Sequence, residues 1–517
     1  MRFLFTNILF CFCFISAFAQ VSIDGRTMAY DSRTKSYLCS VPETWFNDGS
    51  VKAFTCDTAD VQFTFLPIVR LYGKFGYEYA EGTVDVIMPD MTNQESLRAK
   101  VKWRGATTNG LDKNKRNYHL KFLDINGKKK DRKFFGLRSD NSWLLDAAQV
   151  DMSRVRNRVA TDLWNDFATK PYYFDKEPKA LTGTRGQFVE VFLNDEYRGI
   201  YCMTENIDRS QMKLKKYEDN ANGTVTIHGQ LWKAKGFTHC NFSNYSDYDN
   251  TSETWGDFET KYPELEDVNP TDYSIIYDAV HFIRECEAED FFRDREKYID
   301  WPVFYDYYLF CVMLNAIDNH NGKNIFWACY DAQESRMITP AVWDLDCTVG
   351  GYFNPAVTDE PKTFPDHSPR DIALGFNITW QFFLFNDTEF FDKMAARYLE
   401  LRKGPFATNA LKDRYHKYMD MLSRSGAYER EKIRWSGDTD LAGRELNFEE
   451  EAKAIDTWIN KRAAYLDRTM LTLGVNNVEM SNNNDEHTYN LQGICMGKTT
   501  TLPKGVYIKE GRKFIVK

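Results

Sequence analysis

Acidic and amide side chains gather in two stretches that follow one another closely in the chain. The first is the polar run 315–324, which comes directly after a strongly apolar segment. The second is the strand-like segment 337–346, which ends in the two aspartates Asp344 and Asp346. Hard divalent ions such as Mg²⁺ prefer carboxylate and amide oxygens, often together with waters and substrate phosphates. These stretches therefore predict a cation site of that kind.

Four side chains are the candidate ligands: Asp318, Asn324, Asp344 and Asp346. In an extended strand, Asp344 and Asp346 would point to the same side. Asp and Asn are also common in ordinary loops, because they satisfy nearby backbone groups. Here, however, apolar segments flank the cluster, and carboxylates near a core are costly unless they are paired or bound to metal. The flanking segments therefore favour a functional site.

The spacing of apolar residues predicts the helices and strands that position this cluster. An apolar run at 303–317 predicts a buried central helix, and residues 325–329 predict a short strand. Asp151 is a good N-cap for a helix in which Val155, Val159, Leu163 and Phe167 recur every four residues. Alternating apolar residues predict strands at 83–88, 97–103, 118–122, 186–193 and 199–204. Strands, one helix, a hairpin and then helices indicate an α+β fold.

The two ends of the chain carry their own patterns. Residues 1–19 join one positive charge to an apolar run and an Ala-x-Ala ending, which predicts a secretory signal peptide cut after Ala19. We expect a β-rich leader module at 20–81, and a linker with a short β-type tail at 476–517. No apolar run reaches the roughly 20 residues that a transmembrane helix needs. The sequence therefore predicts a secreted or cell-surface protein without a transmembrane segment.

Composition excludes several classes of protein. The chain has 517 residues, of which 66 are basic and 75 acidic, and its formal charge is −9. An acidic chain lacks the basic face expected of a nucleic-acid binder, so we expect no nucleic-acid partner. With 43% hydrophobic and 15% aromatic residues, the chain has ample material for large cores.

Four stretches in this order resemble the CotH (spore coat protein H) family of atypical secreted protein kinases. They are Trp103-Arg-Gly105 followed by 115–121; 151–164 with Arg154 and Arg156-Asn157; 192–208; and Asp318…Asn324…Trp343-Asp-Leu-Asp346. The resemblance implies a divergent two-lobed protein-kinase-like fold at 82–475, with an upper lobe at about 82–208 and a lower lobe at about 209–475.

The resemblance also implies roles for single residues. Asp318 resembles the aspartate that orients or deprotonates the acceptor hydroxyl, and Asn324 the asparagine that helps to hold metal. Asp344 or Asp346 resembles the metal-binding aspartate. Lys115 and Lys121 compete for the role of phosphate-contacting lysine, Arg104 could assist, and Glu205 falls where a nucleotide-binding segment would lie.

The function implied is an ATP-dependent kinase, using Mg²⁺ or Mn²⁺, that acts on Ser or Thr of an extracellular or envelope protein. The glycine loop and the His-Arg-Asp and Asp-Phe-Gly strings of ordinary kinases are absent from the sequence. Two alternatives stay open. One is a catalytically silent kinase-like protein that binds partners at the surface. The other is a metal-dependent hydrolase that uses the paired carboxylates.

Overall fold

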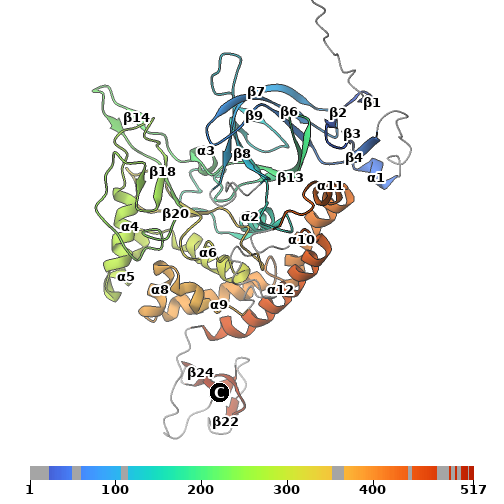
Figure 1. Ribbon diagram of the computed structural model, residues 1–517. Helices are drawn as coiled ribbons and strands as arrows, with labels where there is room; N and C mark the ends of the chain where they lie inside the picture. The colour runs from blue at the N-terminus through green and yellow to red at the C-terminus, as the bar shows by residue number, and fades with distance from the viewer. Residues whose placement is uncertain are drawn as a thin grey trace, which may run out of the picture.

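The computed structural model describes residues 22–48, 60–105, 114–351, 366–439, 445–473, 488–490, 495–497, 502–509 and 512–516. The predicted signal peptide at 1–19 lies outside these residues. The fold is α+β, as the sequence predicted (Figure 1). Among the described residues, no helix combines the length and the apolar character that a membrane crossing requires.

Within the described ranges, seven strands close into a barrel in the order β11-β13-β12-β5-β6-β7-β8. All neighbours are antiparallel except β5 and β12, which run parallel. The barrel strands are β5 (Ile68–Tyr72), β6 (Ala80–Ile87), β7 (Gln94–Arg104), β8 (Asn117–Phe122), β11 (Ser142–Asp146), β12 (Gly186–Leu193) and β13 (Glu196–Thr204). The five strands predicted from alternation are thus present. Their inward side chains, among them Val101, Leu120 and Trp143, fill the barrel with a core of its own.

A smaller sheet at the N-terminus lies beside the barrel. It contains β1 (Ser22–Ile23), β2 (Arg26–Asp31), β3 (Ser36–Ser40) and β4 (Asp60–Thr64), with α1 (Thr44–Asn47) between the last two. The sequence placed the leader module at 20–81, but residues 68–72 form barrel strand β5, and β6 already begins at Ala80. The boundary differs because β5 belongs to the barrel through its pairing with β12, which is more than 100 residues away in the chain.

A second sheet has the order β17-β18-β16-β19-β20 in the part of the chain that is described. Its strands are β16 (Gln230–Ala234), β17 (Thr254–Trp255), β18 (Phe258–Tyr262), β19 (Ile325–Cys329) and β20 (Thr339–Val342). Residues 219–271, which are rich in Asn, Asp, Ser, Thr and Gly, supply three of them. Shorter pieces complete this half of the chain: β9 (Arg132–Lys133), β10 (Ser139–Asp140), α3 (Arg209–Met212), β14 (Glu218–Asp219) and β15 (Val225–Thr226).

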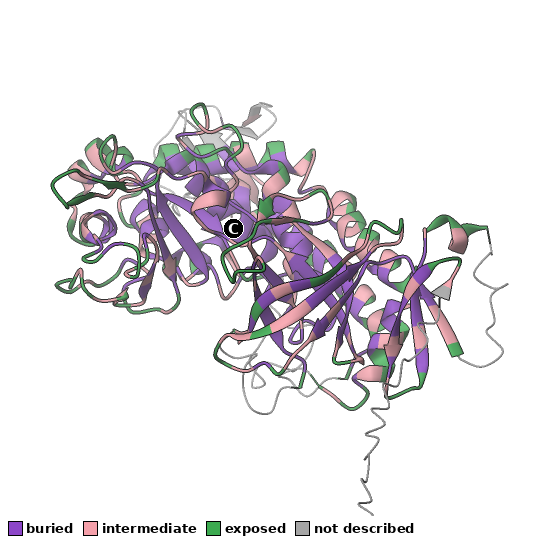
Figure 2. Ribbon diagram, turned by 90° about the horizontal axis from the view of Figure 1, so that it is seen from above, coloured by how far each residue is buried: buried purple, intermediate pink, exposed green. Residues whose placement is uncertain are grey.

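Helices pack around α6 (Trp301–Leu314), which is the buried helix that the sequence predicted (Figure 1). They share one large core with α2 (Arg156–Phe167) and the second sheet. Figure 2 shows buried residues along the strands and helices of the interior. The surrounding helices are α4 (Ser274–Glu285), α5 (Ala288–Asp294), α7 (Pro369–Leu374), α8 (Asn377–Leu384), α9 (Thr388–Arg402), α10 (Thr408–Arg424), α11 (Ala427–Arg434) and α12 (Phe448–Thr469). The C-terminal tail forms β21 (Thr488–Asn490), β22 (Cys495–Gly497), β23 (Gly505–Lys509) and β24 (Arg512–Val516).

The start of α2 differs from the prediction. The helix begins at Arg156 with Val155 in the N-cap position, five residues after Asp151. Asp151 instead stabilises the turn before the helix, because its carboxylate accepts hydrogen bonds from the backbone nitrogens of Ser153 and Arg156 at 2.9 and 2.7 Å. The side chain of Arg156 pairs with the same carboxylate at 2.7 Å.

Candidate active site

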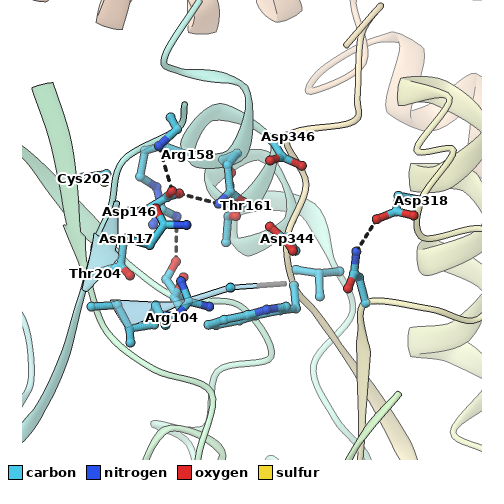
Figure 3. Close-up of a pocket in the computed structure, with 18 of the residues that line it drawn as sticks. Arg104, Asn117, Asp146, Arg158, Thr161, Cys202, Thr204, Asp318, Asp344 and Asp346 are labelled. Atoms are coloured by element: carbon cyan, nitrogen blue, oxygen red, sulfur yellow. Dashed lines mark hydrogen bonds between the residues drawn. The ribbon is translucent and has the colours of Figure 1, made fainter. Parts of the chain in front are cut away.

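A polar cavity of about 410 Å³ lies where the barrel, α2 and the second sheet meet. The barrel contributes Arg104, Asn117 and Asp146, and α2 contributes Asn157, Arg158 and Thr161. The opposite wall comes from β16 and from the two acidic stretches singled out in the sequence (Figure 3). On that wall lie Lys233, Lys235, Asp318, Lys323, Asn324, Trp343, Asp344 and Asp346. Five of the eight predicted site residues therefore surround one cavity.

The loop that carries Asp318 is fixed by the end of α6. The helix stops at Asn315, whose left-handed backbone (φ 45°) turns the chain toward the cavity. The hydroxyl of Tyr307 on α6 donates a hydrogen bond to the carbonyl of Asn319 at 2.9 Å. The Asp318 carboxylate then accepts hydrogen bonds from Lys323 Nζ at 2.9 Å and from Asn324 Nδ2 at 2.6 Å. These hydrogen bonds fix the orientation of the Asp318 carboxylate at the cavity wall.

The segment with Asp344 and Asp346 is not a strand. Strand β20 ends at Val342, and Asp344 has a left-handed backbone (φ 57°), so the expectation that strand alternation puts both aspartates on one side is wrong. Asp and Asn tolerate this conformation better than other non-glycine residues. Both aspartates reach the cavity through this turn.

Two asparagines hold this turn in place. Asn319 is fully buried, and its Nδ2 donates to the carbonyls of Trp343 at 2.8 Å and Asn324 at 3.2 Å. Asn157 on α2 accepts from the backbone nitrogen of Leu345 at 3.1 Å and donates to Asp146 at 2.7 Å. The side chain of Asn157 thus connects the barrel to the aspartate-bearing turn.

Burial and neighbouring charges shift the pKa values of the two aspartates in the cavity. Burial raises the pKa of Asp346 well above its ordinary value, and the charges of Asp344, Asp146, Asp151 and Asp318 raise it further. The pKa of Asp344 is also raised, chiefly because protein atoms surround it, although its side chain is open to the cavity. Arg104 and Lys233 oppose that rise. Burial and Arg104 lower the pKa of Lys233 to about 8.

The residues fit a cation that is bound together with a phosphorylated ligand. The buried Oδ1 of Asp346 has no hydrogen-bond partner within the described part of the chain. Over the same residues, no three His, Cys, Asp or Glu side chains are grouped as a complete protein-only metal site. Mg²⁺ commonly takes only one or two carboxylates and fills its shell with waters and phosphates. Asp344, Asp346 and the amide oxygen of Asn324 would supply such a partial shell.

Lys115 lies away from the cavity. Its side chain is 1% exposed, and Nζ donates to Glu431 Oε1 on α11 at 2.7 Å and to the carbonyl of Ile200 at 2.6 Å. Arg154 Nε donates to the same Glu431 oxygen at 2.8 Å. Burial lowers the pKa of Lys115 to about 7, although Glu431 opposes that change. In this structure Lys115 joins the barrel to α11.

Lys121 and Glu205 also lie outside the cavity lining. Lys121 is on the outer face of the barrel, four residues along β8 from the cavity residue Asn117, a distance of roughly 13 Å. Glu205 is fully buried. It accepts from Arg185 Nη2 at 2.6 Å and from the backbone nitrogen of Arg138 at 3.0 Å. These contacts tie Glu205 to its neighbouring loops.

The sequence reasoning missed several residues that line or build the cavity. Lys233, Lys235 and Asp146 lie in stretches without a distinctive pattern. Lys323 and Asn319 belong to the polar run already singled out, and Asn157 to the Arg156-Asn157 pair. Lys323, Asn319 and Asn157 could therefore have been found from the stretches in which they lie.

The family comparison agrees with this arrangement. Residues 101–466 match the family model described as CotH kinase protein, so the chain belongs to the CotH kinase family and is a kinase-like protein. The match includes every one of the cavity residues named above. A search of curated proteins found no match to the chain.

Proposed function

We propose that this protein is a secreted atypical kinase that transfers the γ-phosphate of ATP, with Mg²⁺ or Mn²⁺, to Ser or Thr of an extracellular or envelope protein. The observation that carries the proposal is the cavity itself, where Asp318 and Asn324 meet Asp344 and Asp346 opposite the cations of the barrel and β16. Phosphoryl transfer depends mainly on positioning and on neutralising phosphate charge, and this cavity has groups for both tasks.

Each wall of the cavity has a distinct task in this proposal. Asp318 accepts the proton of the acceptor hydroxyl. The hydroxyl oxygen bonds to the γ-phosphorus while the bond between that phosphorus and the ADP oxygen breaks. Lys323 holds the Asp318 carboxylate, while Arg104 and Lys233 neutralise phosphate oxygens. A bound divalent ion supplies further neutralisation of the phosphates. The resemblance proposed Lys115 or Lys121 as the phosphate-contacting lysine, and the cavity lining favours Lys233 instead.

The proposal includes a two-lobed arrangement and an address outside the cytoplasm. The barrel would serve as the upper lobe, and α6 with the second sheet and the later helices as the lower lobe. The cavity between them supports this division, because kinases bind the nucleotide between two lobes. The signal-peptide pattern at 1–19 supports secretion.

A catalytically silent binding protein is the second candidate. The observation in its favour is that both oxygens of Asp318 are already engaged, by Lys323 and by Asn324. These contacts leave fewer acceptor positions on Asp318 for the proton of an acceptor hydroxyl. An ordered nucleotide site without turnover would then serve recognition alone.

A labelled-ATP assay on the mature protein separates the two candidates. Phosphate incorporation into the protein itself and into a Ser/Thr-rich model protein is measured with Mg²⁺ and with Mn²⁺. We expect Asp318→Asn to lower the rate by at least about a hundredfold. Asp413→Asn, an exposed position on α10, serves as the matched control and should leave the rate unchanged. Equal incorporation by wild type and Asp318→Asn would contradict the kinase proposal. Nucleotide binding without any incorporation would favour the silent alternative.

A further inference from the structure

The outer face of β7 carries cations at every second position. Leu97, Ala99 and Val101 point into the barrel core. Because side chains alternate along a strand, the residues between them share the outer face. These are Arg98, Lys100, Lys102 and Arg104. Together with Lys121 on the neighbouring strand they form what we call the cationic strip.

The register of β8 places further groups beside these cations. Lys121 lies opposite Lys100, His119 opposite Lys102, and Asn117 opposite Arg104. Lys102 Nζ and Lys121 Nζ lie 4.5 and 4.9 Å from the ring centre of Tyr79. Such cation–π contacts hold both ammonium groups over one aromatic ring.

Hydrogen bonds fix the base of this arrangement. The hydroxyl of Tyr79 is 2.9 Å from His119 Nδ1, and His119 Nε2 is 2.8 Å from the hydroxyl of Ser142 on β11. Tyr79 therefore has a fixed position under the two lysines. The strip is an ordered surface rather than a set of independent side chains.

Few carboxylates compensate the strip. Arg98 pairs with Glu81 at 2.9 Å. In the segments that the structure describes, no ion pair reaches Lys100, Lys102 or Lys121, although the charges of Glu264 and Glu266 act on Lys121. The pKa of His119 is lowered to about 3, by burial first and then by Arg104, Lys121 and Lys102. The local potential is thus positive in a chain whose formal charge is −9.

The strip leads from the cavity to an exposed basic loop. Arg104 lines the cavity (Figure 3), and Arg98 lies six residues away, roughly 20 Å along the strand. Beyond β8 come Lys128, Lys129 and Lys130, all exposed. An extended peptide of about six residues would span the distance from Arg104 to Arg98.

We propose that the cationic strip binds an acidic segment of the acceptor polypeptide and directs a nearby Ser or Thr into the cavity. This proposal rests on the kinase function proposed above. β7 is paired on both sides, by β6 and β8, so the segment is recognised by side-chain charge and not by strand addition. A single row of cations that ends in a phosphoryl-transfer cavity favours one extended polypeptide over a broad polyanion.

Peptide binding to the mature protein tests the strip without turnover. The probes are fluorescent peptides with a run of about six Asp before or after one Ser, and a peptide of the same length with Asn in place of Asp. We expect the acidic peptide to bind more tightly, and its dissociation constant to rise as ionic strength increases from about 0.01 to about 0.15 M. The double variant Lys100→Glu/Lys102→Glu should weaken its binding about tenfold or more.

The matched control is Lys453→Glu/Lys461→Glu, which makes the same charge change at exposed positions of α12. It should leave binding unchanged, and thermal melting confirms that both variants fold. Equal binding of the acidic and Asn peptides, or equal weakening by both variants, would overturn the proposal. Single-stranded DNA that binds the strip as tightly as the acidic peptide would overturn its assignment to a polypeptide.

A kinase assay with the same peptides separates this proposal from the one on which it rests. We expect the Lys100→Glu/Lys102→Glu variant to raise KM for the acidic peptide and leave kcat unchanged. Phosphorylation of both peptides with equal kcat/KM would contradict the strip alone. Strip-dependent binding without phosphorylation of any peptide would contradict the kinase function and retain the docking surface.

Discussion

Two groups of charged residues in this protein differ in how their carboxylates are paired. Around Glu431, one buried carboxylate is met by Lys115, Arg154 and the backbone nitrogen of Ile200. Around Asp344, several carboxylates face one another, and an oxygen of Asp346 lacks a partner among the described residues. Removing one partner from a saturated buried group is costly because a charge is left unpaired, whereas carboxylates held close together at a cavity wall are tolerated where a ligand neutralises them.

The pKa directions follow this difference. Burial alone would raise the pKa of Glu431, but Lys115 and Arg154 outweigh it and the pKa is lowered. For Asp346, neighbouring carboxylates add to the effect of burial. The effect of burial on the carboxyl pKa is thus outweighed at Glu431 and increased at Asp346. Removal of a carboxylate should therefore have opposite consequences for stability at the two places.

The largest expected effect is on the saturated group. Glu431→Ala leaves Lys115 and Arg154 buried without their carboxylate, which should lower the free energy of unfolding by about 3–5 kcal/mol. Urea unfolding measures it. Glu429→Ala, at an exposed position of the same helix, should stay within about 0.5 kcal/mol of wild type. A stable Glu431→Ala variant would end the contrast between the two groups.

The next effect concerns ligand binding at the unsaturated group. If ATP with Mg²⁺ binds there, a concentration of 100 times the dissociation constant should stabilise wild type by about 2.7 kcal/mol. Asp344→Asn should lose most of this shift without loss of stability in the absence of ligand, because it removes one of several like charges. Thermal melting with and without nucleotide tests both statements. A full nucleotide shift in the variant would exclude Asp344 as a ligand.

A smaller effect is the pH dependence of the same group. The folded pKa of Asp346 lies above its unfolded value, so between the two values the folded state binds more protons. This contribution therefore lowers the free energy of unfolding as pH rises through that window. Asp346→Asn should be more stable than wild type at neutral pH, and its advantage should shrink on acidification toward the ordinary Asp pKa. Urea unfolding measures this difference in stability. If the advantage of Asp346→Asn over wild type does not change with pH, the raised pKa of Asp346 is contradicted.

The smallest effect is expected on the outer face of the barrel. Lys121→Met should change KM for ATP by less than about threefold, because Lys121 lies roughly 13 Å from the cavity end of β8. Lys233→Met, inside the cavity, should raise KM about tenfold, which corresponds to about 1.4 kcal/mol. Steady-state kinetics at fixed acceptor concentration compare them. The reverse order would return the phosphate contact to Lys121.

The sequence predicted those parts of the cavity that are close together along the chain. Asp318, Asn324, Asp344 and Asp346 lie in two stretches that follow one another closely between apolar segments, and local patterning was enough to group them. Lys115 could not be interpreted in the same way, because its partner Glu431 is 316 residues away. In the sequence, Lys233 has the pattern of an ordinary strand lysine. Only the folded sheet brings it close to Asp344. Strands and the buried helix were predictable from periodicity, whereas the barrel closure through β5 depended on long-range pairing.

The parallel pairing of β5 with β12 has a practical consequence for shortened forms of the protein. The family match begins at residue 101, inside β7, and so omits β5, β6 and most of β7. A fragment trimmed to that match would break the hydrogen-bonded ring and expose β12 and β8 as bare edges, which invite aggregation. An expressed fragment that contains the family match should therefore start ahead of Ile68, and a soluble fragment is expected only with β5 included.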